Sequence, residues 1–156
     1  MPMPEPALEL KKLEYLVGDW ALEGIVKPGP MGPGGKFTMT EHNYWMDGGF
    51  FLVIQSAFKG GGMPGGSGIA YLGFDPEKNV YTYHEFNSIG EFQHSTGSTE
   101  GDTWTWIGEQ QLGRTSTKTR VTVKTLSPTS YAMTVTVARD GRDWLTVMEG
   151  KATKQK

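Results

Sequence analysis

Residues 19–27 read DWALEGIVK, and this stretch decides the class of fold. Its residues alternate with a period of two, which places successive side chains on opposite faces of an extended strand. One face carries Trp20, Leu22, Gly24 and Val26, and the other carries Asp19, Ala21, Glu23, Ile25 and Lys27. We therefore predict a β-strand here.

The same short period continues along the rest of the chain, interrupted by turn sequences such as Asp47-Gly48-Gly49 and DPEKN at residues 75–79. Glycine-rich residues 28–35 and 59–67 read as loops. The pattern predicts strands at residues 19–27, 36–46, 50–58, 68–74, 80–87, 91–98, 103–109, 114–125, 131–139 and 143–153. The connections are too short for parallel crossovers, and antiparallel sheets of this size usually close on themselves. We predict an all-β fold, an antiparallel up-and-down, lipocalin-like barrel of about ten strands at about residues 19–153, in one domain spanning residues 1–156.

Only the first residues, about 7–17, carry a helical pattern. Apolar residues recur there at mixed spacings of three and four, as Leu8, Leu13, Leu16 and Val17. Gly18 follows, and glycine commonly ends a helix. We predict one short N-terminal helix, with Trp20 buried against it at the base of the barrel.

Charge and composition exclude several functional classes. The chain has 15 Lys and Arg against 17 Asp and Glu, a net charge of -2, so no basic excess attracts nucleic acid. The absence of cysteine removes disulfides, thiolate nucleophiles and thiolate metal ligands. The start, MPMPEP, lacks the features of a signal peptide, and the longest apolar run is too short to span a bilayer. We expect a cytoplasmic monomer or homodimer with no membrane insertion.

Several motif matches fail on their context. Gly60-x-Gly62-x-x-Gly65 has the letters of a dinucleotide fingerprint, but a strand follows it where that motif needs a helix. His42, His84 and His94 show no metal-ligand spacing, and no Gly-x-Ser-x-Gly elbow is present. We expect no dedicated metal site and no cofactor.

Aromatic residues give a more informative pattern. Trp104 and Trp106 share one strand face, and Tyr81 and Tyr83 share another. Rings of this kind either fill a barrel core or wall a ligand pocket, and barrels of this size accommodate both arrangements. We expect the tryptophans to face inward. Missing side-chain volume at Gly24, Gly73 and Gly108 favours the pocket.

Leu13-x-x-Leu16-x-Gly18-x-Trp20 resembles the first helix and strand of the lipocalin and calycin superfamily. Together with residues 27–35 and 47–52, and Gly73-Phe74-Asp75-Pro76 with Tyr81 downstream, the chain resembles a bacterial family of small lipocalin-like domains of unknown function from Leu8 to Lys151. The resemblance implies a barrel similar to nitrobindin and the fatty-acid-binding proteins, and it transfers no catalytic residues. Nitrobindin-type barrels hold haem through a histidine near the C-terminus, whereas the last histidine here is His94.

The leading hypothesis is a small-molecule binding barrel for an apolar or aromatic ligand. Arg120 is either a surface charge or an anion contact of the pocket. The predicted ligand-binding residues are Trp20, Tyr81, Tyr83, Trp104, Trp106 and Arg120, with Trp45 and Trp144 as further candidates.

Two alternatives remain open. One is a cofactor-free isomerase, cyclase or decarboxylase in which Tyr83 and Glu85, with His84 as a further candidate, act as acid and base. The other is a packed barrel without a ligand, in a structural or stress role. A cavity separates the last from the others, and an inward carboxylate or histidine with a perturbed pKa separates catalysis from binding.

Overall fold

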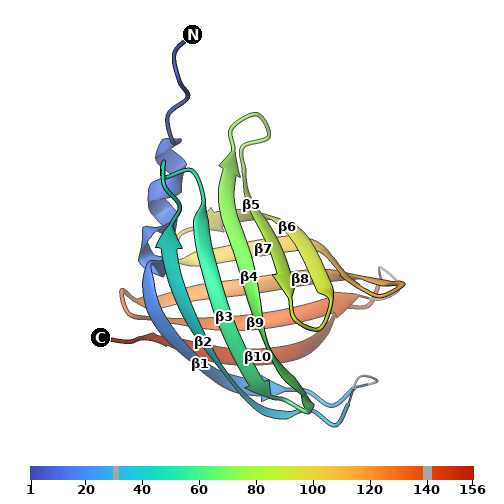
Figure 1. The fold of residues 1–156 in the computed structure, drawn as a ribbon. Coiled ribbons are helices and arrows are strands. Elements are labelled where there is room, and N and C mark those ends of the chain that lie inside the picture. Colours follow the sequence, from blue (N-terminus) through green and yellow to red (C-terminus); the bar gives the residue numbers. More distant parts are fainter. Residues whose placement is uncertain (30–31, 139–141) are drawn as a thin grey trace.

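The structure is a computed structural model that describes residues 1–29, 32–138 and 142–156. Its strands form a closed barrel (Figure 1), with hydrogen-bonded neighbours in the order β1-β10-β9-β8-β7-β6-β5-β4-β3-β2. The strands are β1 (Gly18–Val26), β2 (Gly35–Trp45), β3 (Leu52–Gly60), β4 (Met63–Asp75), β5 (Val80–Asn87), β6 (Glu91–Glu100), β7 (Thr103–Leu112), β8 (Thr115–Ser127), β9 (Ser130–Ala138) and β10 (Leu145–Lys154). All pairs are antiparallel, so the predicted all-β barrel of about ten strands is confirmed.

The predicted N-terminal helix is present as a 3₁₀-helix, η1 (Leu8–Leu16), beside the start of β1 (Figure 1). Its buried residues are Leu10, Leu13 and Leu16. A spacing of three lines these side chains up on one edge, because a 3₁₀-helix has three residues per turn. The prediction that Leu8 belongs to the apolar face is wrong, since Leu8 is 74% exposed. Within the described residues, no helix is long and apolar enough to cross a membrane.

The period of two in β1 sets the inside and outside of the barrel as predicted. Trp20 and Leu22 are buried on the inner face, whereas Asp19 and Glu23 are exposed. Because β1 pairs with both β2 and β10, the backbone of Trp20 lies between Glu41 and Lys154. Alternate residues of those strands therefore also face the interior.

The glycine-rich segment at residues 59–67 is mostly strand, so the predicted loop is wrong there. β3 runs through Gly60 and β4 begins at Met63, which leaves Gly61 and Gly62 as the turn. Both turn residues have φ near +75°, at +72° and +77°, where glycine avoids the strain of a side chain. Residues 30, 31 and 139, within a predicted loop and a predicted strand, lie outside the described residues.

Neighbouring atoms occupy the space beside Gly24, Gly73 and Gly108, the three glycines that favoured a pocket in the sequence. A Cβ built on Gly24 lies 2.8 Å from the ring of Phe37, and one on Gly73 lies 2.8 Å from the ring of Phe51. At Gly108 a Cβ meets the backbone oxygen of a residue on β6. These three positions therefore admit rings and close strand contacts, and any free space inside the barrel has another origin.

Candidate functional site

The helix and a layer of aromatic side chains close one end of the barrel. Leu13 is fully buried there. Side chains of the barrel donate hydrogen bonds to the helix, among them Trp20 Nε1 to Leu16 O at 2.9 Å, Tyr81 Oη to Glu9 O at 2.8 Å and Trp45 Nε1 to Glu14 Oε2 at 2.6 Å. The first two of these bonds satisfy polar atoms that burial would otherwise leave unpaired. The helix is thus fixed as a plug, and Trp20 is buried against it as predicted.

Four of the six predicted ligand-binding residues, Trp20, Tyr81, Trp104 and Trp106, belong to one hydrophobic cluster beneath the plug. Trp104 and Trp106 stack at 5.8 Å with an interplanar angle of 7°, and Tyr81 meets Trp104 edge-on at 4.8 Å. The ring of Trp20 lies 5.0 Å from that of Tyr131. All five rings are at most 8% exposed. The inward orientation of both tryptophans is therefore confirmed, and we call these five residues the aromatic layer.

The inner face of the barrel changes character beyond the aromatic layer. Most inward side chains there are half-buried, including Met39, Glu41, Tyr83, Glu85, Val121, Met133 and Val135. Solvent therefore reaches these inward side chains. We call this part of the interior, between the aromatic layer and the end away from the helix, the distal lumen.

Glu85, on the inner face of β5, carries a hydrogen-bond network. Tyr83 Oη donates to its Oε1 at 2.7 Å, and Gln93 Nε2 donates to its Oε2 at 3.0 Å. Burial raises the pKa of Glu85, although these two hydrogen bonds oppose the shift and the charge of Glu91 adds to it. Burial and the charge of Glu85 hold the pKa of Tyr83 well above its usual value. The sequence-predicted acid–base pair is therefore in direct hydrogen-bond contact.

Glu41 is a second inward carboxyl that sequence reasoning did not single out. The pKa of Glu41 is raised to about 7, mainly by burial. The hydrogen bonds from Asn43 and Tyr131 oppose this shift, and the charge of Glu85 adds to it. Asn43 Nδ2 and Tyr131 Oη each donate a long hydrogen bond of 3.5 Å to Glu41 Oε1. The alternation of β2, which puts Phe37 inside, also puts Glu41 inside, and that signal could have found it.

Two buried polar atoms of the inner face have no hydrogen-bond partner. Asn43 Oδ1 belongs to a side chain that is 1% exposed, and Thr119 Oγ1 to one that is 2% exposed. The amide nitrogen of Asn43 is in use, since it donates to Leu16 O at 2.9 Å as well as to Glu41. Buried polar atoms without partners are rare in folded proteins, so both mark places where a further hydrogen bond is missing.

The other predicted site residues lie away from this network. His84 follows Tyr83 on β5 and is exposed on the outer face. Arg120 also lies on the outer face, with its guanidinium carbon 4.1 Å from the centre of the Trp144 ring. The structure thus does not bring His84, Arg120 or Trp144 to Tyr83. Within residues 1–29, 32–138 and 142–156, no three His, Asp or Glu side chains are grouped as metal ligands.

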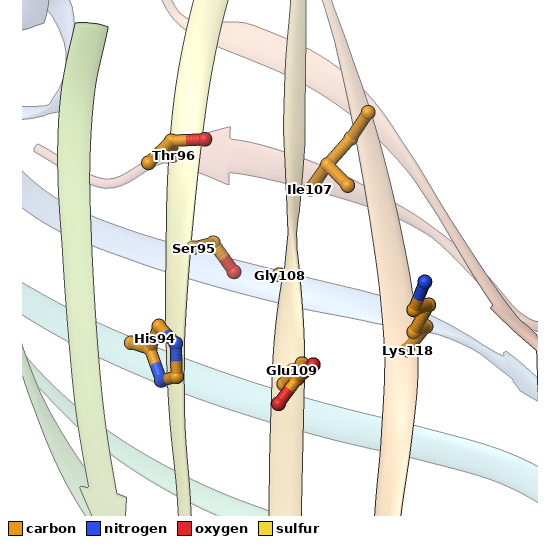
Figure 2. Close-up of a pocket in the computed structure, with 7 residues that line it drawn as sticks. All are labelled: His94, Ser95, Thr96, Ile107, Gly108, Glu109 and Lys118. Atoms are coloured by element: carbon orange, nitrogen blue, oxygen red, sulfur yellow. The ribbon is translucent and has the colours of Figure 1, made fainter. Parts of the chain in front are cut away.

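Two shallow hollows lie in the outer wall. One, of about 350 Å³, is lined by seven residues of three neighbouring strands, β6, β7 and β8 (Figure 2): His94, Ser95, Thr96, Ile107, Gly108, Glu109 and Lys118. The other, of about 510 Å³, is lined by Gln55, Ser56, Ser67, Gly68, Ile69, Phe86, Asn87 and Ser88. Most of these side chains face outward and share no buried hydrogen-bond network with one another. The distal lumen is therefore the stronger candidate site.

Comparisons with known proteins agree with the fold. The family described as "Protein of unknown function (DUF1579)" matches residues 5–154. Among solved structures, the chain is similar to "Crystal Structure of Rv2717c from M. tuberculosis", with a TM-score of 0.69 and 16% identity over 97% of this chain and 100% of that chain. At that identity the likeness shows the fold. No curated protein matched the chain.

Proposed function

Since the chain belongs to the family of unknown function DUF1579, we propose its function from the interior of the barrel: it binds a small molecule in the distal lumen. The apolar part of the ligand lies against Val121, Met133 and Val135. Tyr83 and Trp106, whose rings are 5.8 Å apart, form the wall that the ligand meets. The remaining rings of the aromatic layer support that wall.

The contrast between the two halves of the interior carries this proposal. Side chains of the aromatic layer are at most 8% exposed, whereas the inward side chains beyond it, such as Glu41, Tyr83 and Met133, are half-buried. A purely structural barrel gains stability by filling its core to close packing along its whole length. Space lined by apolar walls and a few convergent polar groups is typical of a ligand site.

The proposal includes a lipocalin-like relationship. Barrels of that type bind ligands inside an up-and-down sheet, and a barrel of about this size holds one small ligand. The closed antiparallel order of the ten strands and the helix at one end support this kinship.

A second function, acid–base catalysis without a cofactor, is favoured by one observation. Tyr83 Oη lies 2.7 Å from Glu85 Oε1, and burial raises the pKa of both groups. A carboxylate with a raised pKa is a better proton acceptor near neutral pH. If the protein is an enzyme, a ligand retained from the host is converted by the wild type and returned unchanged by Glu85→Gln, as read by mass spectrometry.

The binding proposal is tested with a neutral apolar dye, Nile red. We expect saturable, stoichiometric fluorescence enhancement with the native protein. Val121→Phe places a ring beside Trp106, its cross-strand partner, and we expect it to weaken dye binding at least about tenfold by filling the distal lumen.

Thr122→Phe is the matched control, because it adds the same ring one residue along β8 on the outer face. We expect it to leave the dye affinity unchanged. Equal effects of the two variants, or no saturable binding by folded wild-type protein, would contradict the proposal. Either result would favour the alternative of a packed barrel without a ligand.

A further inference from the structure

The charge inside the barrel has one dominant sign. Glu41, Glu85 and Glu91 all project from inward positions of β2, β5 and β6. Among the described strand residues, Lys154 is the only Lys or Arg at an inward position, and it lies at the helix end with Nζ 5.2 Å from the centre of the Trp20 ring. No ion pair joins Glu41, Glu85 or Glu91 to a Lys or Arg of the described strands.

An unpartnered atom beside Glu41 points to the same chemistry independently. Asn43 uses its amide hydrogens on Leu16 O and Glu41, which leaves Oδ1, an acceptor, without a donor. Beside a carboxyl group, a surplus of acceptors is complemented by a group that only donates. A protonated amine has three such donors and no acceptor.

We propose that the ligand of the distal lumen carries a protonated amine on an apolar body, and that Glu41 and Glu85 bind this amine. This inference rests on the proposed ligand-binding function. Asn43 Oδ1, next to Glu41, supplies a neutral acceptor. Tyr83, Gln93 and Tyr131 donate to the same carboxylates and hold them in place. A ligand carboxylate is excluded by repulsion from Glu41 and Glu85.

Binding of the amine depends on the ionisation of Glu41. The titratable groups that face it are Tyr15 of η1, Tyr83 and Glu85 of β5 and Tyr131 of β9. Burial places the pKa of Glu41 at about 7, and the tyrosines remain protonated at that pH. An alkylamine stays cationic until about pH 10, as lysine does. The affinity for an amine therefore rises as the pH increases through 7.

Three probes share a ten-carbon alkyl chain and differ only in their polar group: decylamine, decanol and decanoate. Each is used to displace Nile red from the full-length protein at pH 8, which measures the preference of the site for an amine. We expect decylamine to bind about tenfold more tightly than decanol, and decanoate more weakly than both, as charge-assisted hydrogen bonding requires. Between pH 8 and pH 5.5 the advantage of decylamine should disappear while the affinity for decanol stays constant.

Variants locate the effect. Glu41→Gln and Glu85→Gln should each remove most of the preference for decylamine and leave decanol binding unchanged. Glu23→Gln, an exposed carboxyl on β1, is the control and should change neither. If Glu41→Gln does not fold, as judged by its thermal transition, Glu85→Gln and the pH series decide the question.

The failures of the two proposals are distinguishable. If Nile red does not bind the wild type, ligand binding itself is wrong. If Nile red binds but decylamine, decanol and decanoate compete equally, or decanoate competes best, the amine specificity is wrong and the binding site remains.

Discussion

The ring of Trp106 lies against the backbone of Gly97, its cross-strand partner on β6. A Cβ built on Gly97 would stand 2.5 Å from ring carbon Cε3 of Trp106, closer than real Cβ contacts allow. Glycine at position 97 thus sets the position of the ring that forms the wall of the distal lumen. The ring in turn stacks on Trp104 and extends the aromatic layer.

Gly97→Ala should therefore disturb the aromatic layer. We expect it to lower the free energy of unfolding by about 1–3 kcal/mol, because added volume in a packed core forces a shift. Chemical denaturation measures the loss, and tryptophan fluorescence of the folded state should change as the ring moves. Gly29→Ala, where nothing lies within 4 Å, is the control; a loss as large there would contradict the explanation.

A second prediction follows from the three-residue spacing of the buried leucines in the 3₁₀-helix. Leu13→Ala empties a fully buried site at the plug and should cost about 2–5 kcal/mol. Leu8→Ala removes the same atoms from a side chain that is 74% exposed and should cost under about 0.5 kcal/mol. Urea unfolding of the two variants measures both values. Similar costs would mean that Leu8 also lies on the docked face of the helix, as the mixed spacing of three and four in the sequence indicated.

The strand alternation made much of the fold predictable. The inward faces of Trp20, Trp104 and Trp106 follow from period two within each strand, because a residue's face depends only on its parity. The spacing of three among Leu10, Leu13 and Leu16 was also present, but Leu8 and Val17 fitted a mixed helical pattern equally well. Packing against the barrel end, which no local pattern contains, selects between the two.

The site was less predictable because it depends on contacts far apart in the chain. Tyr83 and Glu85 were chosen from one strand, and their hydrogen bond is local. Glu41 was missed, although its parity is the same as that of Phe37. Its pKa depends on burial and on Tyr131, which lies 90 residues away and reaches it only after the barrel closes.

Trp20 offers a test of the hydrogen bond that holds the plug. Trp20→Ala should cost about 3–5 kcal/mol of unfolding free energy, as for other buried aromatic residues. Trp20→Phe retains much of the ring contact with Tyr131 but loses the bond from Nε1 to Leu16 O, and should cost less than the alanine variant. Denaturant titration gives both values. A loss below about 1 kcal/mol for Trp20→Ala would contradict the packing described here.

The inward carboxyl Glu41 should make stability fall as the pH rises. Its pKa is raised to about 7 in the folded protein, whereas an unfolded glutamate titrates near its ordinary value of 4.5. Between these two values the unfolded state releases its proton first, so ionisation favours unfolding. The contribution of Glu41 is therefore most favourable below about pH 4.5 and is lost by about pH 7, a change of up to about 3 kcal/mol. The pKa of Glu85 is raised as well and acts in the same direction.

Glu41→Gln removes this titration while keeping the shape of the side chain. We expect the variant to be more stable than the wild type at pH 8 and to show a flatter pH dependence between about pH 4.5 and 7. Urea unfolding at a series of pH values measures both effects. Glu23→Gln, which is exposed on the outer face of β1, should keep the wild-type profile. A wild-type stability that rises through this window, with Glu41→Gln less stable at pH 8, would show that Glu41 is ionised and held by a partner in the folded barrel.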